Sequence, residues 1–352
     1  MHIREAILED NAELKELQAK CPQGTTLMVS NVNTPDFFAR AKGYESYKVF
    51  VACEGDRIIG SGACAIRNGR VNGDLCRIGY EFQVFTSPKH RNKGVARELL
   101  QHIEEYLTQN HAVLSYSLIM EDNLPSMKLV ESQGFKPHRT LVMPVLLSYK
   151  EMDVPSVEKI RQITLSDLAP VADLLNDTWE GHDFFEPVSA ETLAQFINRT
   201  PAYSIDNLFI MEDQGQILAC LGYWDWSQIM RITVLADNLP LNIRMRSLIL
   251  NIARKFKPMP RVPRAGDTLK QWMLSPLAFR TADHLSALLR YVNNRARIKG
   301  IEQIMCVCEQ NHELLRSMKG LFRRDVMIHL YIKPLRKMAI GDNPVFLDGI
   351  DL

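Results

Sequence analysis

Charge of one sign, long apolar runs and paired cysteines are all scarce in this sequence. The 42 Lys and Arg residues nearly balance the 41 Asp and Glu residues, a net charge of +1, so bulk charge does not favour nucleic acid or an acidic membrane surface as a partner. No segment approaches the roughly 20 apolar residues that span a bilayer, and the charged N-terminus lacks the apolar core of a signal peptide. We therefore expect a cytoplasmic protein with no membrane or nucleic-acid partner.

The seven cysteines are odd in number and scattered along the chain. Such a set indicates reduced thiols rather than a disulfide framework. Cys306 and Cys308 form a CxC within an apolar run, where alternate residues share one face of a strand. No second Cys pair or His cluster accompanies them, as a zinc site would require. The sequence therefore predicts buried thiols and no metal site.

Three patterns recur in the same order along the chain, whose 352 residues suffice for two domains. The first is a short strand followed by a capped helix, the second is a hairpin around a polar turn, and the third is an apolar strand that ends in Asn. Their two copies lie at 2–19 and 160–175, at 48–66 and 208–226, and at 116–123 and 305–311. This order predicts a tandem duplication; chance similarity between two α/β domains is the alternative.

The expected join falls near 148–156, where charged residues and Pro155 interrupt the apolar pattern. We predict a first domain of α/β (α+β) type at 1–147, a second at 156–340, and a tail at 341–352 without helix or strand signal. All four Trp residues lie in the second half. We expect them in core or interdomain packing rather than around a ligand.

The segment from 79 to 100 has the pattern of an anion-binding site. A β-rich run at 79–86 is followed by Pro88, a basic loop leads to Gly94, and from Val95 the apolar period becomes helical. The first N–H groups of a helix lack intrahelical partners and lie at its positive end, so they bind anions. The motifs GxxxxGK(S/T) and GxGxxG are absent, which disfavours a P-loop nucleotide and a dinucleotide. The loop therefore predicts another diphosphate ligand.

The loop sequence RNKGVA (91–96) resembles the Arg/Gln-x-x-Gly-x-Gly/Ala signature of the GNAT acyltransferase superfamily, in which loop amides hold the pyrophosphate of acetyl-CoA. Downstream, NLPSMKLVESQGF (123–135) looks like the block in which that family's Asn and the following helix contact the coenzyme. Asn123 and Gly134 also suit the start and end of a helix. The resemblance covers most of residues 1–147 and implies two tandem GNAT-like domains, each a mixed, mostly antiparallel sheet flanked by helices. The coenzyme-binding residues that it implies are Val84, Phe85, Thr86, Arg91, Asn92, Lys93, Gly94, Val95, Ala96, Asn123 and Ser126.

Transfer of an acyl group from a thioester to an amine calls for a base and for an acid or a good leaving group. The resemblance implies a carboxylate base on the strand before the loop, where Glu81 is the first candidate and Tyr80 the second. A strand of period two turns Glu81 away from the face of Thr86 unless a bulge resets the register, so we expect Glu81 to be solvated or ion-paired at the surface. Val130 occupies the position of the family's Tyr acid. Either Tyr116 replaces it, or the thiolate leaves unassisted because a thiol pKa lies near 8.5.

The second half lacks the coenzyme signature, because residues 275–281 contain no Gly at the corresponding turn. We interpret it as a degenerate domain that serves as a scaffold, a homodimer surface or one wall of the acceptor site. Asn311 leaves partial coenzyme binding open. In such folds acceptor specificity comes from the segment here at 21–47, in which 30–38 fits either a cleft rim or a loop that enters a helix at Thr34.

The resulting hypothesis is an N-acyltransferase that moves an acetyl or other acyl group from its CoA thioester, with acetyl-CoA as cosubstrate, to a primary amine. Two alternatives stay open. One is a non-catalytic acyl-CoA-binding or regulatory protein, because no catalytic residue is secure. The other is a tandem enzyme that acylates an amino-sugar thiol precursor, which would carry the intact loop in its second domain.

Overall fold

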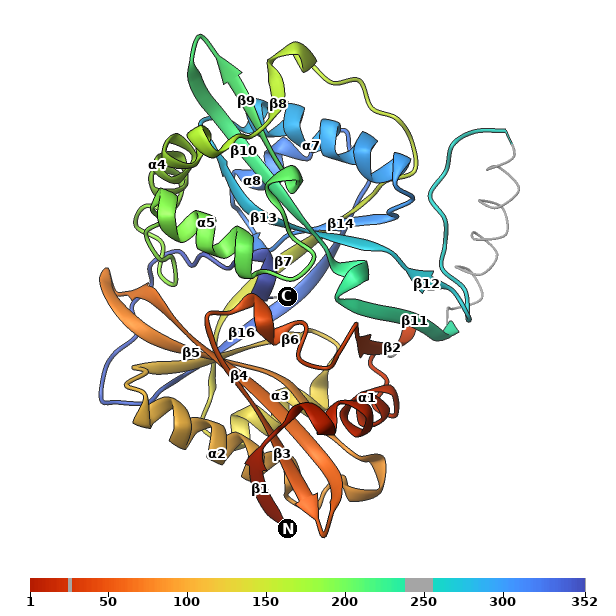
Figure 1. Cartoon of the computed structure of the whole chain (residues 1–352), viewed down its shortest axis with the longest axis vertical. Helices are drawn as coiled ribbons and strands as arrows, with labels where there is room; N and C mark the ends of the chain where they lie inside the picture. The colour runs from red at the N-terminus through yellow and green to blue at the C-terminus, as the bar shows by residue number, and fades with distance from the viewer. Residues whose placement is uncertain (25–26, 238–255, 352) are drawn as a thin grey trace.

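The computed structural model describes residues 1–24, 27–237 and 256–351 of the chain. Within these ranges the strands form one 13-stranded sheet and one three-stranded sheet. Figure 1 shows the first half of the chain below and the second half above, with β7 and β16 between them and the C-terminus near the middle of the molecule.

The elements of the first half are β1 (His2–Glu5), η1 (Leu8–Asp10), α1 (Asn11–Ala19), β2 (Leu27–Asn33), η2 (Ala41–Gly43), β3 (Ser46–Glu54), β4 (Arg57–Val71), β5 (Asp74–Thr86), η3 (Pro88–His90), α2 (Val95–Gln109), β6 (Leu114–Met120), α3 (Leu124–Ser132) and β7 (Lys136–Leu147). Those of the second half are η4 (Val157–Lys159), β8 (Ile160–Gln162), η5 (Leu165–Asp167), α4 (Leu168–Trp179), α5 (Ala190–Arg199), η6 (Ile205–Asn207), β9 (Leu208–Asp213), β10 (Gln216–Asp225), η7 (Trp226–Gln228), β11 (Met230–Asp237), β12 (Thr268–Leu269), β13 (Gln271–Phe279), α7 (Ala282–Ile298), β14 (Gln303–Met305), β15 (Cys308–Glu309), α8 (Leu314–Ser317), β16 (Arg323–Pro334) and η8 (Gly349–Asp351).

The large sheet runs without interruption through both halves. Its order is β1-β3-β4-β5-β6-β16-β7-β14-β13-β10-β9-β8, and β15 also pairs with β7. The pairs β5–β6 and β13–β14 are parallel, and the other pairs are antiparallel. This mixed, mostly antiparallel sheet with flanking helices confirms the predicted fold class.

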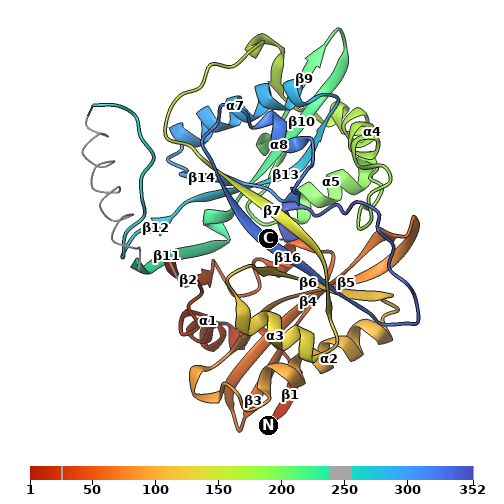
Figure 2. The same cartoon turned by 180° about the vertical axis from the view of Figure 1, so that it is seen from behind.

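The two halves exchange strands at the centre of the sheet. β16, near the end of the chain, lies between β6 and β7 of the first half and is antiparallel to both. β7 in turn pairs with β14 of the second half, and Figure 2 shows β7 and β16 crossing together between the two halves. The predicted boundaries at 147 and 156 therefore divide the sequence but do not divide the sheet.

The same strand-to-helix turn is built once in each half. Arg4 donates to both carboxylate oxygens of Asp10 at 2.7 and 2.8 Å, and Arg161 donates to those of Asp167 at 2.7 and 2.8 Å. Each carboxylate also accepts the backbone N–H three residues before it, as a helix-capping group does. The repeated geometry confirms the predicted duplication.

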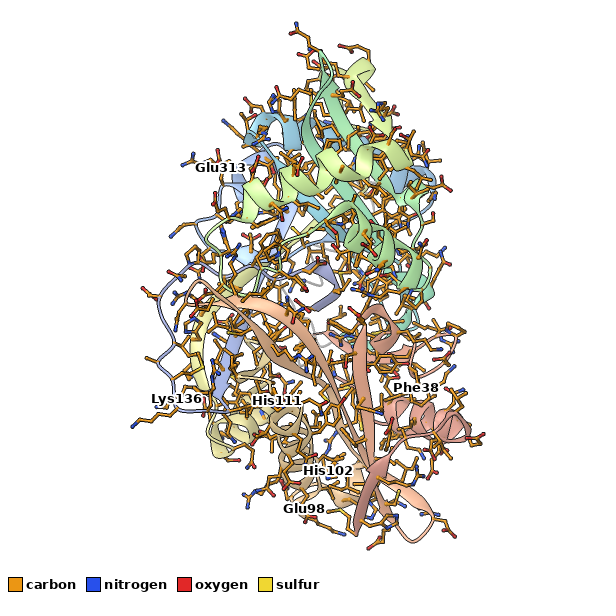
Figure 3. All side chains as sticks on the ribbon, turned by 60° about the vertical axis from the view of Figure 1, so that its left-hand side comes forward. Phe38, Glu98, His102, His111, Lys136 and Glu313 are labelled. Carbon is orange, nitrogen blue, oxygen red and sulfur yellow. The ribbon has the colours of Figure 1, made fainter. Side chains whose placement is uncertain are left out.

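Helices cover both faces of the first half's strands. α2 packs so closely on β5 that a Cβ at Gly79 would lie 2.5 Å from the Leu107 side chain. α1 packs on the opposite side and contacts β2, β4 and β5. Figure 3 shows Glu98 and His102 of α2 on one side of these strands and Phe38, near α1, on the other. We call these sides the α2 face and the α1 face.

Backbone pairing joins the two halves on the α1 face as well. β2 of the first half pairs with β11 of the second in the small sheet. The Phe184 N–H donates to the Arg70 carbonyl at 2.7 Å, and the Arg70 N–H donates to the Phe185 carbonyl at 3.0 Å. All four Trp side chains are buried, which confirms that they serve packing.

Within the described ranges, no helix is both long and apolar enough to cross a membrane. The same residues contain no group of three or more His, Cys, Asp and Glu side chains that could hold a metal ion. The seven cysteines are free thiols, and all except the half-buried Cys76 are buried.

Candidate functional site

A gap opens between β5 and β6, the parallel pair of the first half. The two strands pair only at Ile78–Leu114, Gly79–Ser115 and Tyr80–Tyr116, and then separate. The Ser117 hydroxyl, on β6, donates to the Glu81 carbonyl at 3.1 Å, so it satisfies the first β5 carbonyl beyond the paired region. Past this point, Val84 on β5 and Leu118 on β6 stay partly exposed.

A bulge in β5 shapes one side of this gap. On β5, Gln83 and Val84 together lie opposite the single residue Gly62 of β4, and Gln83 has a φ of 52°. A bulge adds one residue to the strand, so it changes which side chains share a face. Glu81 therefore lies on the same α2 face as Thr86, and the register prediction made for an unbulged strand is wrong.

The Glu81 side chain is buried, with 1% of its surface exposed, so the expectation of a surface role is also wrong. Its Oε1 accepts the Ser115 hydroxyl at 2.5 Å, while Oε2 is buried and has no partner in the part of the chain that the structure describes. Burial raises the pKa of Glu81 to about 8; the Ser115 hydrogen bond opposes the shift, and nearby Glu104 adds to it. Glu104 itself pairs with Lys333 at 2.5 Å. This shift favours the protonated, carboxylic acid form of Glu81 near neutral pH.

The predicted phosphate loop has the backbone shape of an anion site. Asn92 and Gly94 have φ values of 61° and 87°, and residues 91–94 are exposed. The Glu98 N–H donates to the Gly94 carbonyl at 3.0 Å, so the N–H groups of 95–97 precede the regular pattern of α2 and lie at its positive end. A Cβ at Gly94 would approach only the Glu98 carboxylate, at 3.9 Å, so the space beside this backbone is open.

The other predicted coenzyme residues of β5 surround the end of the gap. Val84 lies in the bulge and is half-buried, whereas Phe85 is buried in the cluster that includes Leu14 of α1. Thr86 ends the strand, and its carbonyl accepts the Cys21 thiol at 3.3 Å. Burial raises the pKa of Cys21, although Arg91 of the loop opposes the shift. The structure thus brings the loop and the end of β5 together, as predicted.

The downstream block forms α3, and its ends are capped as the sequence indicates. The Asn123 Oδ1 accepts the Ser126 N–H at 3.3 Å, and Gly134 follows the helix with a φ of 88°. Val130 is buried in a cluster with Phe135 and Tyr331. Tyr331 comes from β16 of the second half, so local sequence gave no signal for it. Val130 has no ionisable group, so it cannot protonate the leaving thiolate.

On the α1 face, stacked aromatic rings close the apex of the gap. The ring centroids of Phe82 and Tyr80 are 5.0 Å apart, those of Tyr80 and Tyr116 4.8 Å, and those of Tyr116 and Phe184 5.0 Å. Burial raises the pKa of Tyr80 to about 12 and that of Tyr116 well above its usual value. These two candidates therefore form a wall and are poor proton donors.

The end of the chain reaches this wall, which the sequence did not predict. Asp351 is buried; its main-chain carbonyl accepts the Tyr80 hydroxyl and Arg40, the latter at 3.2 Å. Its carboxylate accepts the Tyr44 hydroxyl at 3.0 Å and pairs with Arg67 at 3.3 Å. Part of the predicted tail, in which the sequence carries no helix or strand signal, therefore contacts this wall.

The same C-terminal segment packs against the corresponding gap of the second half and narrows it. β13 and β14 pair at three positions and then separate, and residues 346–349 line the space between them. Gly349 lies so close that a Cβ there would be 2.4 Å from the Leu274 carbonyl oxygen. Cys306 and Val307, which line this gap, are buried, whereas Ser117 and Leu118 at the equivalent places of the first half are partly exposed. The absence of the coenzyme signature from the second half thus coincides with a gap that the C-terminal segment narrows.

The gap, the loop and the helix that follows it fall within residues 12–135, and these residues match the family model described as Acetyltransferase (GNAT) family. Residues 12–135 therefore form a GNAT acetyltransferase domain. The resemblance carried by RNKGVA and by the Asn123 block is confirmed.

Solved structures extend the likeness in fold to the whole chain. N-myristoyltransferase of Saccharomyces cerevisiae with bound myristoyl-CoA superimposes with a TM-score of 0.64 at 10% identity, covering 94% of this chain and 82% of that one. A GCN5-related N-acetyltransferase from Sphaerobacter thermophilus gives a TM-score of 0.55 at 14% identity, covering 97% and 98%. At these identities the likeness shows the fold alone. No curated protein matches the chain.

Proposed function

We propose that the chain is an N-acyltransferase that moves an acetyl group from acetyl-CoA to a primary amine. The observation that carries the proposal is the gap between β5 and β6, which opens beside the exposed loop at the N-terminus of α2. The loop would bind the coenzyme diphosphate through backbone N–H groups. The pantetheine arm would then lie along the unpaired edge of β5 near Val84.

We propose that the two substrates approach the gap from opposite faces of the sheet. Because the loop lies at the end of α2, the coenzyme approaches from the α2 face and the amine from the α1 face. Glu81 lies on the coenzyme side, so we propose that it is the acid for the leaving sulfur and not the base for the amine. The amine nitrogen bonds to the thioester carbon, the C–S bond breaks, and sulfur takes the Glu81 proton. The amine proton passes to water, which reprotonates Glu81.

The aromatic wall supports acetyl as the transferred group. Tyr80, Phe82 and Tyr116 are each at most 5% exposed, so the apex of the gap ends at close-packed rings. The yeast N-myristoyltransferase of similar fold holds a long-chain CoA thioester, which supports a CoA thioester as the ligand. A long chain would have to displace this wall, whereas an acetyl group would not.

The decisive experiment measures binding of acetyl-CoA to the full chain by calorimetry, and release of the CoA thiol with a panel of primary amines. Binding with acceptor-dependent thiol release supports the enzyme. Binding without turnover for any amine favours the non-catalytic acyl-CoA-binding alternative. Absence of binding overturns both.

One acetyl-CoA is expected to bind per chain, because residues 346–349 line and narrow the second gap. The same titration reports this stoichiometry. Two equivalent sites would contradict the assignment of the coenzyme to the first half alone, and would revive partial coenzyme binding at Asn311.

A further inference from the structure

Arg40 is held in a fixed position on the α1 face by both halves of the chain. Its guanidinium carbon lies 5.0 Å from the ring centroid of Phe82 on β5 and 5.7 Å from that of Trp226 in the second half. Its Nη2 donates to the Tyr80 hydroxyl at 3.1 Å and to the Asp351 carbonyl at 3.2 Å. Aromatic faces and neutral oxygens stabilise a guanidinium and orient its planar set of donors.

The charge of Arg40 is left without a carboxylate partner among the described residues. The Asp351 carboxylate forms an ion pair with Arg67 at 3.3 Å, and the Asp36 carboxylate forms one with Lys42 at 2.7 Å. The Nε of Arg40 is buried and has no acceptor, although the residue as a whole is half-buried. Buried donors and charges are costly unless they are paired, so within the described residues Arg40 lacks an acceptor for Nε and an anionic partner.

Arg40 lies on the face of the sheet from which the amine is proposed to approach. The side chain touches Tyr80 and Phe82, the two β5 residues of the acceptor face, on either side of the strand position of Glu81. A group bound to Arg40 therefore lies across β5 from the coenzyme loop. Arg40 also belongs to the segment 21–47, from which acceptor specificity was expected.

We propose that Arg40 binds a carboxylate of the acceptor, so that the acceptor is a free amino acid or another small amine that also carries a carboxylate. The inference rests on the proposed acyl transfer. Guanidinium and carboxylate form charge-assisted hydrogen bonds, whose planar geometry would fix the distance from the carboxylate to the amine.

The test compares L-amino acids with their carboxamides as acceptors, with acetyl-CoA as donor and thiol release as the readout. The best acceptor is expected to carry a carboxylate and to exceed its amide in kcat/KM by about 10-fold or more. Arg40→Gln is expected to lower kcat/KM for that acid about 10- to 50-fold, mainly through KM. Turnover of its amide and the Kd for acetyl-CoA should stay unchanged, and Arg40→Lys should fall between wild type and Arg40→Gln.

Lys42→Gln is the matched control, because it removes one positive charge from the same segment at a residue that already has a carboxylate partner. It should leave the acid-to-amide ratio unchanged. Turnover confined to amines without a carboxylate, or equal losses for acid and amide in Arg40→Gln, would overturn the inference and leave the proposed function standing. Bound acetyl-CoA with no turnover in either series would overturn both the inference and the catalytic function.

Discussion

Glu81→Gln is expected to lower kcat for acyl transfer about 100-fold, the lower end of the usual range for general acid–base catalysis. Glu81 lies where β5 and β6 separate, on the side from which we propose that the coenzyme enters, and its Oε2 has no partner among the described residues. Its pKa of about 8 is close to the value of about 8.5 for a free thiol, so a proton can pass between them at little cost. The amide has the same shape and cannot donate that proton.

The pH dependence separates this role from a structural one. The acid form of Glu81 is lost as pH rises through its pKa of about 8, so wild-type kcat should fall on the alkaline side and the Glu81→Gln profile should lack that limb. The free energy of unfolding should also depend on the protonation of Glu81. A carboxyl whose pKa rises on folding contributes stability at low pH, which is lost as pH rises from the unfolded value toward the folded one. The melting temperature of Glu81→Gln, measured by calorimetry, should therefore depend less on pH over that interval.

Two variants control this experiment. Ser115→Ala removes the hydrogen bond to Oε1 that opposes the rise in the Glu81 pKa, so it should shift the alkaline limb to higher pH while keeping activity. Glu105→Gln changes an exposed carboxylate of α2 and should change neither rate nor profile. A Glu81→Gln enzyme with wild-type kcat and an intact alkaline limb would show that the thiolate leaves unassisted.

What the sequence could predict depends on how local the determining contacts are. Short runs of consecutive residues determine the loop, the start of α2 at Val95 and the cap at Asn123. Each of these features lies at the predicted place. The bulge was harder to predict, because one extra residue at Gln83 does not change the pattern of β-favouring side chains along the strand. Its effect on Glu81 was large, since one extra residue reverses every later side chain.

Contacts between distant parts of the chain were beyond sequence reasoning. Tyr80 and Asp351 are 271 residues apart along the chain, and the last residues have no periodic pattern from which their contacts could be predicted. The loop before Arg40 is also determined by a distant contact. One of the two predictions for this segment is a helix that begins at Thr34, whereas the structure has bends and turns there. Asn11 of α1 accepts the Phe37 N–H at 2.8 Å there, so a tertiary contact overrides the local signal.

Gly94→Val is expected to weaken binding of acetyl-CoA about 100-fold, because it distorts the loop that would hold the diphosphate. Gly94 has a φ of 87°, a conformation that costs an ordinary residue about 1–2 kcal/mol and a β-branched one more. A valine there would shift the backbone and turn the N–H groups at the start of α2 away from the ligand. Calorimetric titration with acetyl-CoA measures the change in Kd.

S-Acetylpantetheine, which lacks the diphosphate and the nucleotide, tells loop binding apart from general damage. Gly94→Val should lower kcat/KM with acetyl-CoA and leave the weaker reaction with S-acetylpantetheine unchanged. Gly215→Val is the matched control, since Gly215 has a φ of 79° and equally open surroundings but lies in the β9–β10 turn of the second half. It bears the same backbone strain, so it should lower the melting temperature without changing the Kd. Equal losses with both donors would show that Gly94 supports the fold of the site and does not contact the diphosphate.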